Sequence, residues 1–297
     1  MMRLRLFLKN SARVALNSLL VTALCLLTAC SSSTSPTFLK KNMAQAMQDI
    51  CKKEYSIDSK ATLVGDTFWV YVPLENIVEE TKAKKKIVDD FAIERLQGAP
   101  EQRNLKFEYS IQHAPQERDK EYKYNKQAVE KINNAWKVLR RIIFSLDRSK
   151  GNEPKFYCFI YADTNNGDEV SEIFYYLDLK KVSYEYISWN EYQHRTIQDT
   201  FRNPAAIGDK EGTHIYYRDI TMPEFIVAQI LHRMRLKFQK PELEGKNVDV
   251  DKETTKIISY VVTIYNFQDF DFVELNNLVT KNRIVLNRRA LWEKPNQ

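Results

Sequence analysis

The feature that most limits what this chain can fold into lies at its start, where a basic segment precedes a short apolar run. An apolar run covers residues 19–29. It follows the basic residues Arg3, Arg5, Lys9 and Arg13, and no acidic residue precedes it. A bilayer-spanning helix needs about 20 apolar residues, so a run of this length is too short to cross a membrane. A basic region followed by a short apolar region and small residues is typical of an export signal. We therefore expect the folded body to lie entirely after residue 29.

The end of the apolar run carries a more specific motif. The tetrapeptide Leu27-Thr28-Ala29-Cys30 resembles the lipobox of bacterial lipoproteins. In that family a diacylglycerol is attached to the cysteine thiol, a peptidase cuts before the cysteine, and the new amino group is often acylated. The resemblance implies a signal peptide over residues 1–29, a mature chain that starts at lipidated Cys30, and a polar tether over residues 30–38.

The residue after the cysteine bears on where such a lipoprotein is delivered. Ser31 is not the aspartate that retains members of the family in the inner membrane. The resemblance therefore implies the outer membrane, facing the periplasm, if the source has two membranes. The expected partners are the membrane, through the N-terminal lipid, and an unknown envelope protein or glycan.

Net charge argues against nucleic acid as a partner. The chain has a formal charge of +6, and the four basic residues of the export signal supply most of it, leaving +2 on the mature part. Nucleic-acid-binding surfaces show a strong basic excess. A hydrophobic content of 43% with 15 Phe and 16 Tyr residues is instead typical of a folded domain.

The spacing of apolar residues predicts several helices. The clearest is residues 126–146, where Val129, Ile132, Trp136, Leu139 and Ile143 recur at intervals of 3, 4, 3 and 4 and leave the basic residues toward solvent. Capping patterns predict two more helix starts, at Ser188 with Glu191 and at Thr221 with Glu224. The complete set of expected helices is 39–54, 76–96, 126–146, 189–201, 221–240 and 256–266, the last of them chosen over a strand with Asp251 as its cap.

Runs of aromatic and β-branched residues predict strands between these helices. Asn166-Gly167 separates two such runs and is typical of a β-hairpin turn. The expected strands are residues 61–72, 105–111, 155–163, 170–178 and 213–218, and the stretch 268–297 receives no assignment.

Mixed helices and strands that include a hairpin favour an α+β fold, with a largely antiparallel sheet and helices packed on one of its faces. A polar, glycine-containing stretch over residues 203–212 suggests a break. It would separate an α+β domain over residues 39–205 from a mixed, more helical C-terminal part over residues 206–297. A single domain with a long loop at this place is equally consistent with the pattern.

Two cysteines remain in the mature body after the lipidated one. Cys51 and Cys158 could form a disulfide in an oxidising compartment. Alternatively, Cys158 is a small buried side chain within an aromatic strand. Neither cysteine has the C-x-x-C spacing of a redox or zinc site.

No organised catalytic or metal-binding motif is present, so we expect no catalytic residue, metal or cofactor. His113, His194, His214 and His232 lack paired metal-ligand spacing, although His194 and His214 could meet in space. Residues 163–169 are rich in oxygen ligands, but Gly and the acidic residues occupy the wrong positions for an EF-hand calcium loop. A tight turn is the expected structure there.

A cluster of aromatic residues follows the predicted hairpin. Its members, Tyr175, Tyr184, Tyr186, Trp189 and Tyr192, lie close together in the sequence. Large rigid rings with a polar tip are common in glycan and protein interfaces, which makes this cluster the candidate interaction surface. The alternative is that the rings pack the hairpin onto neighbouring helices.

These features favour a lipid-anchored cell-envelope protein with a non-catalytic binding or scaffolding role. They do not decide whether the protein has an enzymatic activity. One alternative is an envelope hydrolase that acts on peptidoglycan or another glycan. Another is a secretion or assembly component that docks partners through its aromatic hairpin. A pocket with convergent carboxylates, or with His194 and His214, would favour the hydrolase.

Overall fold

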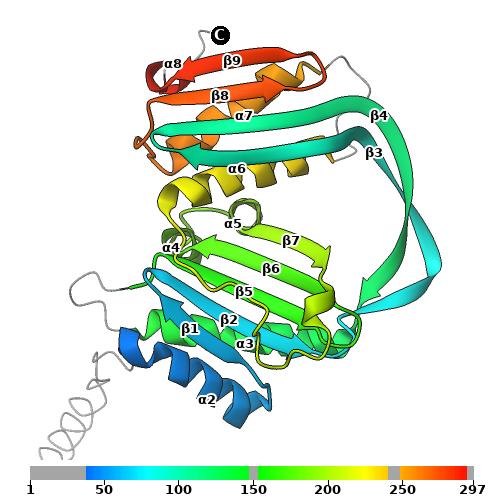
Figure 1. Ribbon diagram of the computed structural model, residues 1–297. Helices are drawn as coiled ribbons and strands as arrows, with labels where there is room; N and C mark the ends of the chain where they lie inside the picture. The colour runs from blue at the N-terminus through cyan, green and yellow to red at the C-terminus, as the bar shows by residue number, and fades with distance from the viewer. Residues whose placement is uncertain (1–37, 147–152, 240–247, 293–297) are drawn as a thin grey trace, which may run out of the picture. The chain divides into compact units, whose positions relative to one another are not determined.

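Two β-sheets and the helices packed on them make up the part of the chain that the computed structural model describes, residues 38–146, 153–239 and 248–292 (Figure 1). This is the α+β class expected from the sequence, with mostly antiparallel strands divided between two sheets. The signal peptide, Cys30 and the tether up to residue 37 lie outside the described residues.

The first sheet has five strands in the order β1-β2-β5-β6-β7. Their bounds are β1 Lys60–Val64, β2 Thr67–Leu74, β5 Phe156–Asp163, β6 Asp168–Tyr175 and β7 Ile197–Arg202. β2 and β5 pair in parallel, and the other neighbours are antiparallel. Every residue of the central strand β5 is buried, because both faces of the sheet are covered.

One face of this sheet is covered by α2 (Met43–Tyr55), which follows the short helix η1 (Lys40–Asn42), and by α3 (Lys126–Phe144) (Figure 1). Four residues of the stripe predicted for α3, Ile132, Trp136, Leu139 and Ile143, pack against alternate residues of β2, β5 and β6, as the period of two in a strand requires, whereas Val129 is exposed. Asn125 caps α3 by accepting hydrogen bonds from the backbone N–H groups of Gln127 and Ala128.

The opposite face is covered by residues 203–221, which we call the strap. It contains the short helix η2 (Pro204–Ala206) and otherwise runs in extended or turn conformation. Backbone bonds from Asn203 to Gly167 and from Gly208 to Thr164 fix its first part to the β5–β6 turn. Trp69 donates its indole N–H to the carbonyl of Arg218 near the strap's end.

The second sheet has four strands in the order β3-β4-β8-β9. β3 (Val78–Glu101) and β4 (Asn104–Tyr124) form a long hairpin, and β4 pairs in parallel with β8 (Phe272–Asn277), which pairs with β9 (Asn282–Asn287). The helices α6 (Met222–Phe238) and α7 (Val250–Ile264) share the hydrophobic core of this sheet, and α8 (Arg288–Trp292) ends the described chain. Gly98 allows α6 to approach β3 closely, since a Cβ there would meet Val227 at 3.0 Å and Phe107 at 2.8 Å.

Several local predictions are confirmed. Thr221 and Glu224 form a complete capping box at the start of α6, with Pro223 in its first turn. Gly167 adopts a φ of 78° in the β5–β6 hairpin, a conformation that glycine takes without strain. The helix favoured near residues 256–266 exists as α7, and its cap is Asp249 rather than Asp251.

Other local predictions were wrong. The charged segment 76–96 is strand β3 and not a helix, because it pairs with β4 along its length. The helix that begins after Ser188 is α5 (Trp189–Arg195), and it stops before the β-branched pair Thr196-Ile197, where β7 begins. Tyr176 starts α4 (Tyr176–Ser183) instead of continuing a strand, and residues 213–218 belong to the strap and form no strand.

The break expected at residues 203–212 falls inside the strap. It does not separate the two sheets, because the second sheet takes β3 and β4 from before it and β8 and β9 from after it. Residues from 38 onward group into one compact unit. Within the described ranges, no helix is long and apolar enough to span a bilayer.

Candidate functional site

A cavity of about 870 Å³ lies on the α3 side of the five-stranded sheet. We call it the tryptophan cavity, after Trp136 and Trp189 in its wall. Its lining combines rings, amides and charged groups from six elements: Asn133, Trp136, Lys137 and Arg140 of α3, Glu172 and Gln198 of β6 and β7, Leu179, Val182 and Ser183 of α4, Glu185 and Thr196 of the connecting loops, Trp189, Tyr192, Gln193 and His194 of α5, and His232 and Leu236 of α6.

The α3 wall follows from helical spacing. Asn133, Trp136, Lys137 and Arg140 stand at i, i+3, i+4 and i+7, so they share one side of the helix. The rings of Phe159 on β5 and Phe174 on β6 pack against Trp136, at centroid distances of 5.1 and 4.8 Å. Lys137 and Arg140 are exposed, as the position of the basic residues off the apolar stripe predicts, and they also line the cavity.

Glu172 is the carboxylate of the cavity and comes from the buried face of β6. Val170 and Phe174, two residues away on either side, point into the core from the same face. The indole N–H of Trp136 donates to Glu172 Oε2 at 3.0 Å, and the Tyr161 hydroxyl reaches the same oxygen at 3.5 Å. Oε1 has no hydrogen bond to any described residue. Burial raises the pKa of Glu172, more than these two hydrogen bonds lower it.

Two histidines also line the cavity. His232 of α6 is buried, and its Nε2 has no hydrogen-bond partner among the described residues. Burial, with the neighbouring charges of Arg233 and Arg235, lowers the pKa of His232 to about 4, so this ring is neutral at pH 7. His194 lies on α5, whose backbone carbonyl at this position accepts a bond from Gln229 of α6 at 2.7 Å.

A buried ion network holds α5 in place at the cavity wall. Arg195 donates to Asp178 of α4 and to Glu191 of α5, both at 2.8 Å. Arg233 of α6 donates to the same Glu191 at 2.9 Å, and the Tyr265 hydroxyl donates to Asp178 at 2.7 Å. The network joins three helices and the end of a fourth, so α5 is tied to its neighbours by bonds that need no ligand.

The aromatic cluster predicted as an interaction surface is only partly exposed. Tyr184, Tyr186 and Trp189 are exposed to 60%, 80% and 58%. Tyr192 is buried, since it lies one turn after Trp189 on the inward side of α5 and joins the core. Tyr175 is half-buried because its ring packs against Phe156 and Phe225 on the other side of the sheet.

The strap side of the same sheet holds a different polar cluster, which we call the His214 clamp. The side chains of Glu169, Asp209 and His214 are each at most 9% exposed. His214 Nδ1 lies 2.6 Å from Asp209 Oδ2, and Nε2 lies 2.9 Å from Glu169 Oε2. Because both ring nitrogens face carboxylate oxygens, both must donate, which requires the charged imidazolium.

The clamp is fully partnered. Burial disfavours the charge on His214, but the hydrogen bonds and charges of Asp209 and Glu169 outweigh it and raise the pKa of His214. Burial likewise opposes the charge on Asp209, yet bonds from His214 and nearby backbone N–H groups hold the pKa of Asp209 far below its usual range. Asn203 donates to Glu169 Oε2 at 3.1 Å. In a catalytic triad the second ring nitrogen of the histidine contacts a nucleophile. In the clamp this nitrogen contacts the Glu169 carboxylate, which is no such nucleophile, so the clamp serves to hold the strap on the sheet.

The two histidines that sequence analysis considered as a pair are therefore apart. Glu169 and Glu172 lie three residues apart on β6, so they point to opposite faces of the sheet. His214 bonds Glu169 on one face, and His194 lines the cavity that holds Glu172 on the other.

Of the two alternatives for the cysteines, the structure shows the one without a disulfide, since Cys51 and Cys158 are both free and buried. Cys51 of α2 belongs to the core on the α3 side of the first sheet, whereas Cys158 of β5 points to the strap side and packs with Phe156 and Phe225. The sheet itself separates the two thiols.

Residues 163–169 form the expected turn. The Asp163 carboxylate accepts hydrogen bonds from the backbone N–H groups of Ile77, Asn165 and Asn166. These bonds lower the pKa of Asp163 against the opposing effect of burial. In the described part of the chain, no group of three His, Cys, Asp or Glu side chains could hold a metal ion.

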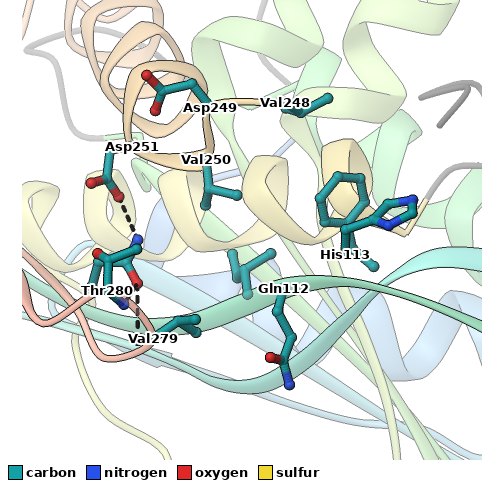
Figure 2. A pocket seen from close by; sticks show the side chains of 11 residues that line it. Gln112, His113, Val248, Asp249, Val250, Asp251, Val279 and Thr280 are labelled. Atoms are coloured by element: carbon teal, nitrogen blue, oxygen red, sulfur yellow. Dashed lines mark hydrogen bonds between the residues drawn. The ribbon is translucent and has the colours of Figure 1, made fainter. Parts of the chain in front are cut away.

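A second cavity, of about 520 Å³, lies beside the second sheet and is lined by His113, Asp249, Asp251 and Thr280 among others (Figure 2). The Asp251 carboxylate in it accepts bonds from the Tyr109 hydroxyl and Asn277, both at 2.6 Å, and from Asn282 at 2.9 Å. These bonds tie α7 to β4 and to the β8–β9 hairpin, so the polar group of this cavity serves the fold.

Comparison with known proteins adds no family: no family model, curated protein or solved structure matches this chain. The candidate site is therefore defined by its geometry alone. Glu172, Lys137, Arg140 and His232 come from three separate elements, so no sequence pattern groups them.

Proposed function

We propose that this chain is a lipid-anchored cell-envelope protein whose folded body binds a ligand in the tryptophan cavity. The observation that carries the proposal is the cavity itself, with a volume of about 870 Å³ and a lining of two Trp rings, a half-buried carboxyl and two basic side chains. Ligand sites are concave, with an apolar and aromatic wall and a few polar groups that fix orientation. The lipobox-like Leu27-Thr28-Ala29-Cys30 supports a location in the cell envelope.

The exposed Trp189 provides the direct test of ligand binding. Trp189→Ala removes the ring at the cavity mouth, and Tyr216→Ala, at a site 82% exposed and outside the cavity lining, is the matched control. We expect the full-length protein and Tyr216→Ala to be retained on isolated peptidoglycan sacculi, and Trp189→Ala to be retained at least tenfold less. Equal retention of all three proteins would contradict binding at this cavity.

The anchor is tested separately. Two or three acyl chains hold a protein at a bilayer where a single chain is marginal, since each buried methylene contributes about 0.8 kcal/mol. Cys30→Ser should therefore move the protein from the membrane to the soluble fraction. A Cys30→Ser protein that stays with the membranes after a high-salt wash would contradict the lipid anchor.

One observation favours a second candidate, an envelope hydrolase acting on peptidoglycan or another glycan. Glycosidases use two carboxyl groups, one of them a general acid whose pKa is raised. Glu172 has a raised pKa, and Glu185 also lines the cavity. Release of reducing ends from sacculi that disappears in Glu172→Gln would replace the binding proposal by this one.

A further inference from the structure

The basic residues of the tryptophan cavity lack the kind of acidic partner that Arg141 has on the same helix. Arg141, the neighbour of Arg140, donates to Glu54 at 2.8 Å. Arg140 forms no ion pair with any described residue, and Lys137 donates only to the neutral Asn134, at 3.0 Å. Both cations line the cavity one helical turn apart, so their positive charge is available to an anionic group of a ligand.

The aromatic wall fits a flat, partly apolar ring. Trp189 is 58% exposed and packs on the buried Tyr192 at a centroid distance of 5.3 Å, which fixes the orientation of the indole. A rigid ring at the mouth of a cavity offers a stacking surface at little entropic cost. The C–H face of a sugar ring is a matching surface of this size.

The inner wall fits neutral hydrogen-bonding groups. Glu172 Oε1 has no hydrogen bond, and His232 Nε2 is buried without a partner, in each case among the described residues. Asn133, Gln193 and Gln198 add amide groups to the lining. A buried polar atom without a partner, such as His232 Nε2, carries a free-energy penalty that a ligand hydroxyl or amide would remove, and Glu172 Oε1 offers a free acceptor in the same cavity.

We infer that the cavity binds a glycan segment that carries a carboxylate, with the sugar ring on Trp189 and the carboxylate on Arg140 and Lys137. This inference rests on the proposed function, because it names the ligand class of the same cavity. Arg matches a carboxylate with two parallel N–H donors, and Lys adds a point charge beside it. Sugar hydroxyls or N-acetyl groups meet Glu172 and His232 inside.

The test is isothermal titration of the detergent-solubilised full chain with two probes. N-acetylmuramyl dipeptide carries a sugar ring and a carboxylate, and tri-N-acetylchitotriose is a neutral sugar. Arg140→Gln removes the unpaired cation, and Arg141→Gln, in which the lost cation already has a partner, is the matched control. Lys137→Gln is the second variant, and the thermal midpoint of each protein is measured to confirm folding.

We expect the muramyl dipeptide to bind at least tenfold more tightly than the neutral trimer. Arg140→Gln and Lys137→Gln should each weaken its binding at least fivefold, Arg141→Gln should leave it unchanged, and the affinity for the trimer should stay the same in all of them.

Equal affinities for both probes, unaffected by Arg140→Gln, would overturn the acidic ligand and leave the cavity's binding role standing. Failure of both probes to bind, together with equal retention of Trp189→Ala on sacculi, would overturn the proposed function as well. Binding to phosphatidylglycerol vesicles that Arg140→Gln abolishes, without binding of the dipeptide, would assign the cations to a lipid headgroup and overturn the inference.

Discussion

The two faces of the five-stranded sheet each hold a glutamate from the same strand, buried on the strap side and half-buried on the α3 side, and they use it in opposite ways. On the strap side, Glu169 meets His214 and Asn203, and the three-residue clamp leaves no ring nitrogen without a partner. On the α3 side, Glu172 uses one oxygen and leaves the other open to a cavity. A satisfied buried cluster stabilises a fold, whereas an incompletely satisfied one beside a cavity is prepared for a ligand. The difference separates the structural side of the sheet from the side proposed to bind.

The largest expected effect is on the structural side. His214→Ala leaves two carboxylates, Glu169 and Asp209, buried without the cation between them. Removing one partner of a buried ionic group costs about 3–5 kcal/mol. We expect the free energy of unfolding in urea to fall by that amount. A loss below about 1 kcal/mol, which is ordinary for a point substitution, would show that the clamp does not fasten the strap.

The pH dependence of stability should carry the signature of the clamp. The pKa of His214 is raised above its ordinary value of 6.5, so its contribution is complete below pH 6.5 and is lost as the pH rises through the folded value. The pKa of Asp209 is lowered from 3.8, so its contribution is complete above pH 3.8 and is lost as the pH falls. We expect the urea midpoint of wild type to decline between pH 6.5 and pH 9.0, below the ordinary pKa of the buried cysteines, whose raised pKa values act only at higher pH, and we expect this decline to be absent in His214→Gln. His232, whose pKa is lowered from 6.5 to about 4, changes the stability only below about pH 6.5. A similar alkaline decline in both proteins would exclude His214 as its source.

A matched pair on β6 compares the two faces directly. Glu169→Gln removes a charge that pairs with the imidazolium, and hydrogen bonds to charged groups are worth about 1.5–3 kcal/mol. Glu172→Gln keeps an acceptor for the Trp136 indole and removes a carboxyl that burial already disfavours as an anion, so it should cost less than about 1 kcal/mol. Urea unfolding of the two variants tests this order. The reverse order would mean that the faces have been assigned the wrong roles.

The smallest expected effect on stability is at the cavity mouth. Exposed substitutions away from special features change the free energy of unfolding by about 0.5 kcal/mol or less. Trp189→Ala should stay within this limit while ligand retention falls. A destabilisation several times larger than this limit would show that Trp189 supports the fold and would remove it as a specific probe of binding.

The elements that could be predicted from sequence are those specified by local patterns. The α3 helix predicted from its 3-4-3-4 stripe, the Thr221–Glu224 capping box and the Asn166-Gly167 turn each depend on neighbours within a few residues, and each was confirmed, except that Val129 of the stripe is exposed. The strand β3 was missed because its charged segment has helical composition, and its pairing with β4 is a tertiary contact. The short α5 was predicted too long because a cap marks where a helix begins and says nothing of where it ends.

The candidate site was harder to predict because it combines three stretches of the chain that lie far apart in sequence: α3, residues 172–198 and α6. The sequence of β6 contains one signal of the site. Glu172 lies between Val170 and Phe174, and all three residues face the same side of the sheet, toward the core. A carboxylate at such a position is rarely buried without a purpose. The stripe from Asn133 to Arg140 could have been identified as a polar helix side, but nothing in the sequence places His232 of α6 opposite it.

The central claim is that ligand binds on the α3 side of the sheet while the strap side holds the fold together. Hydrogen–deuterium exchange of the full chain, with and without saturating muramyl dipeptide, tests it most directly. We predict increased protection of the amides of residues 133–140 and 189–198, with no change in residues 203–221. Protection confined to residues 203–221, or no protection at any amide, would contradict the account.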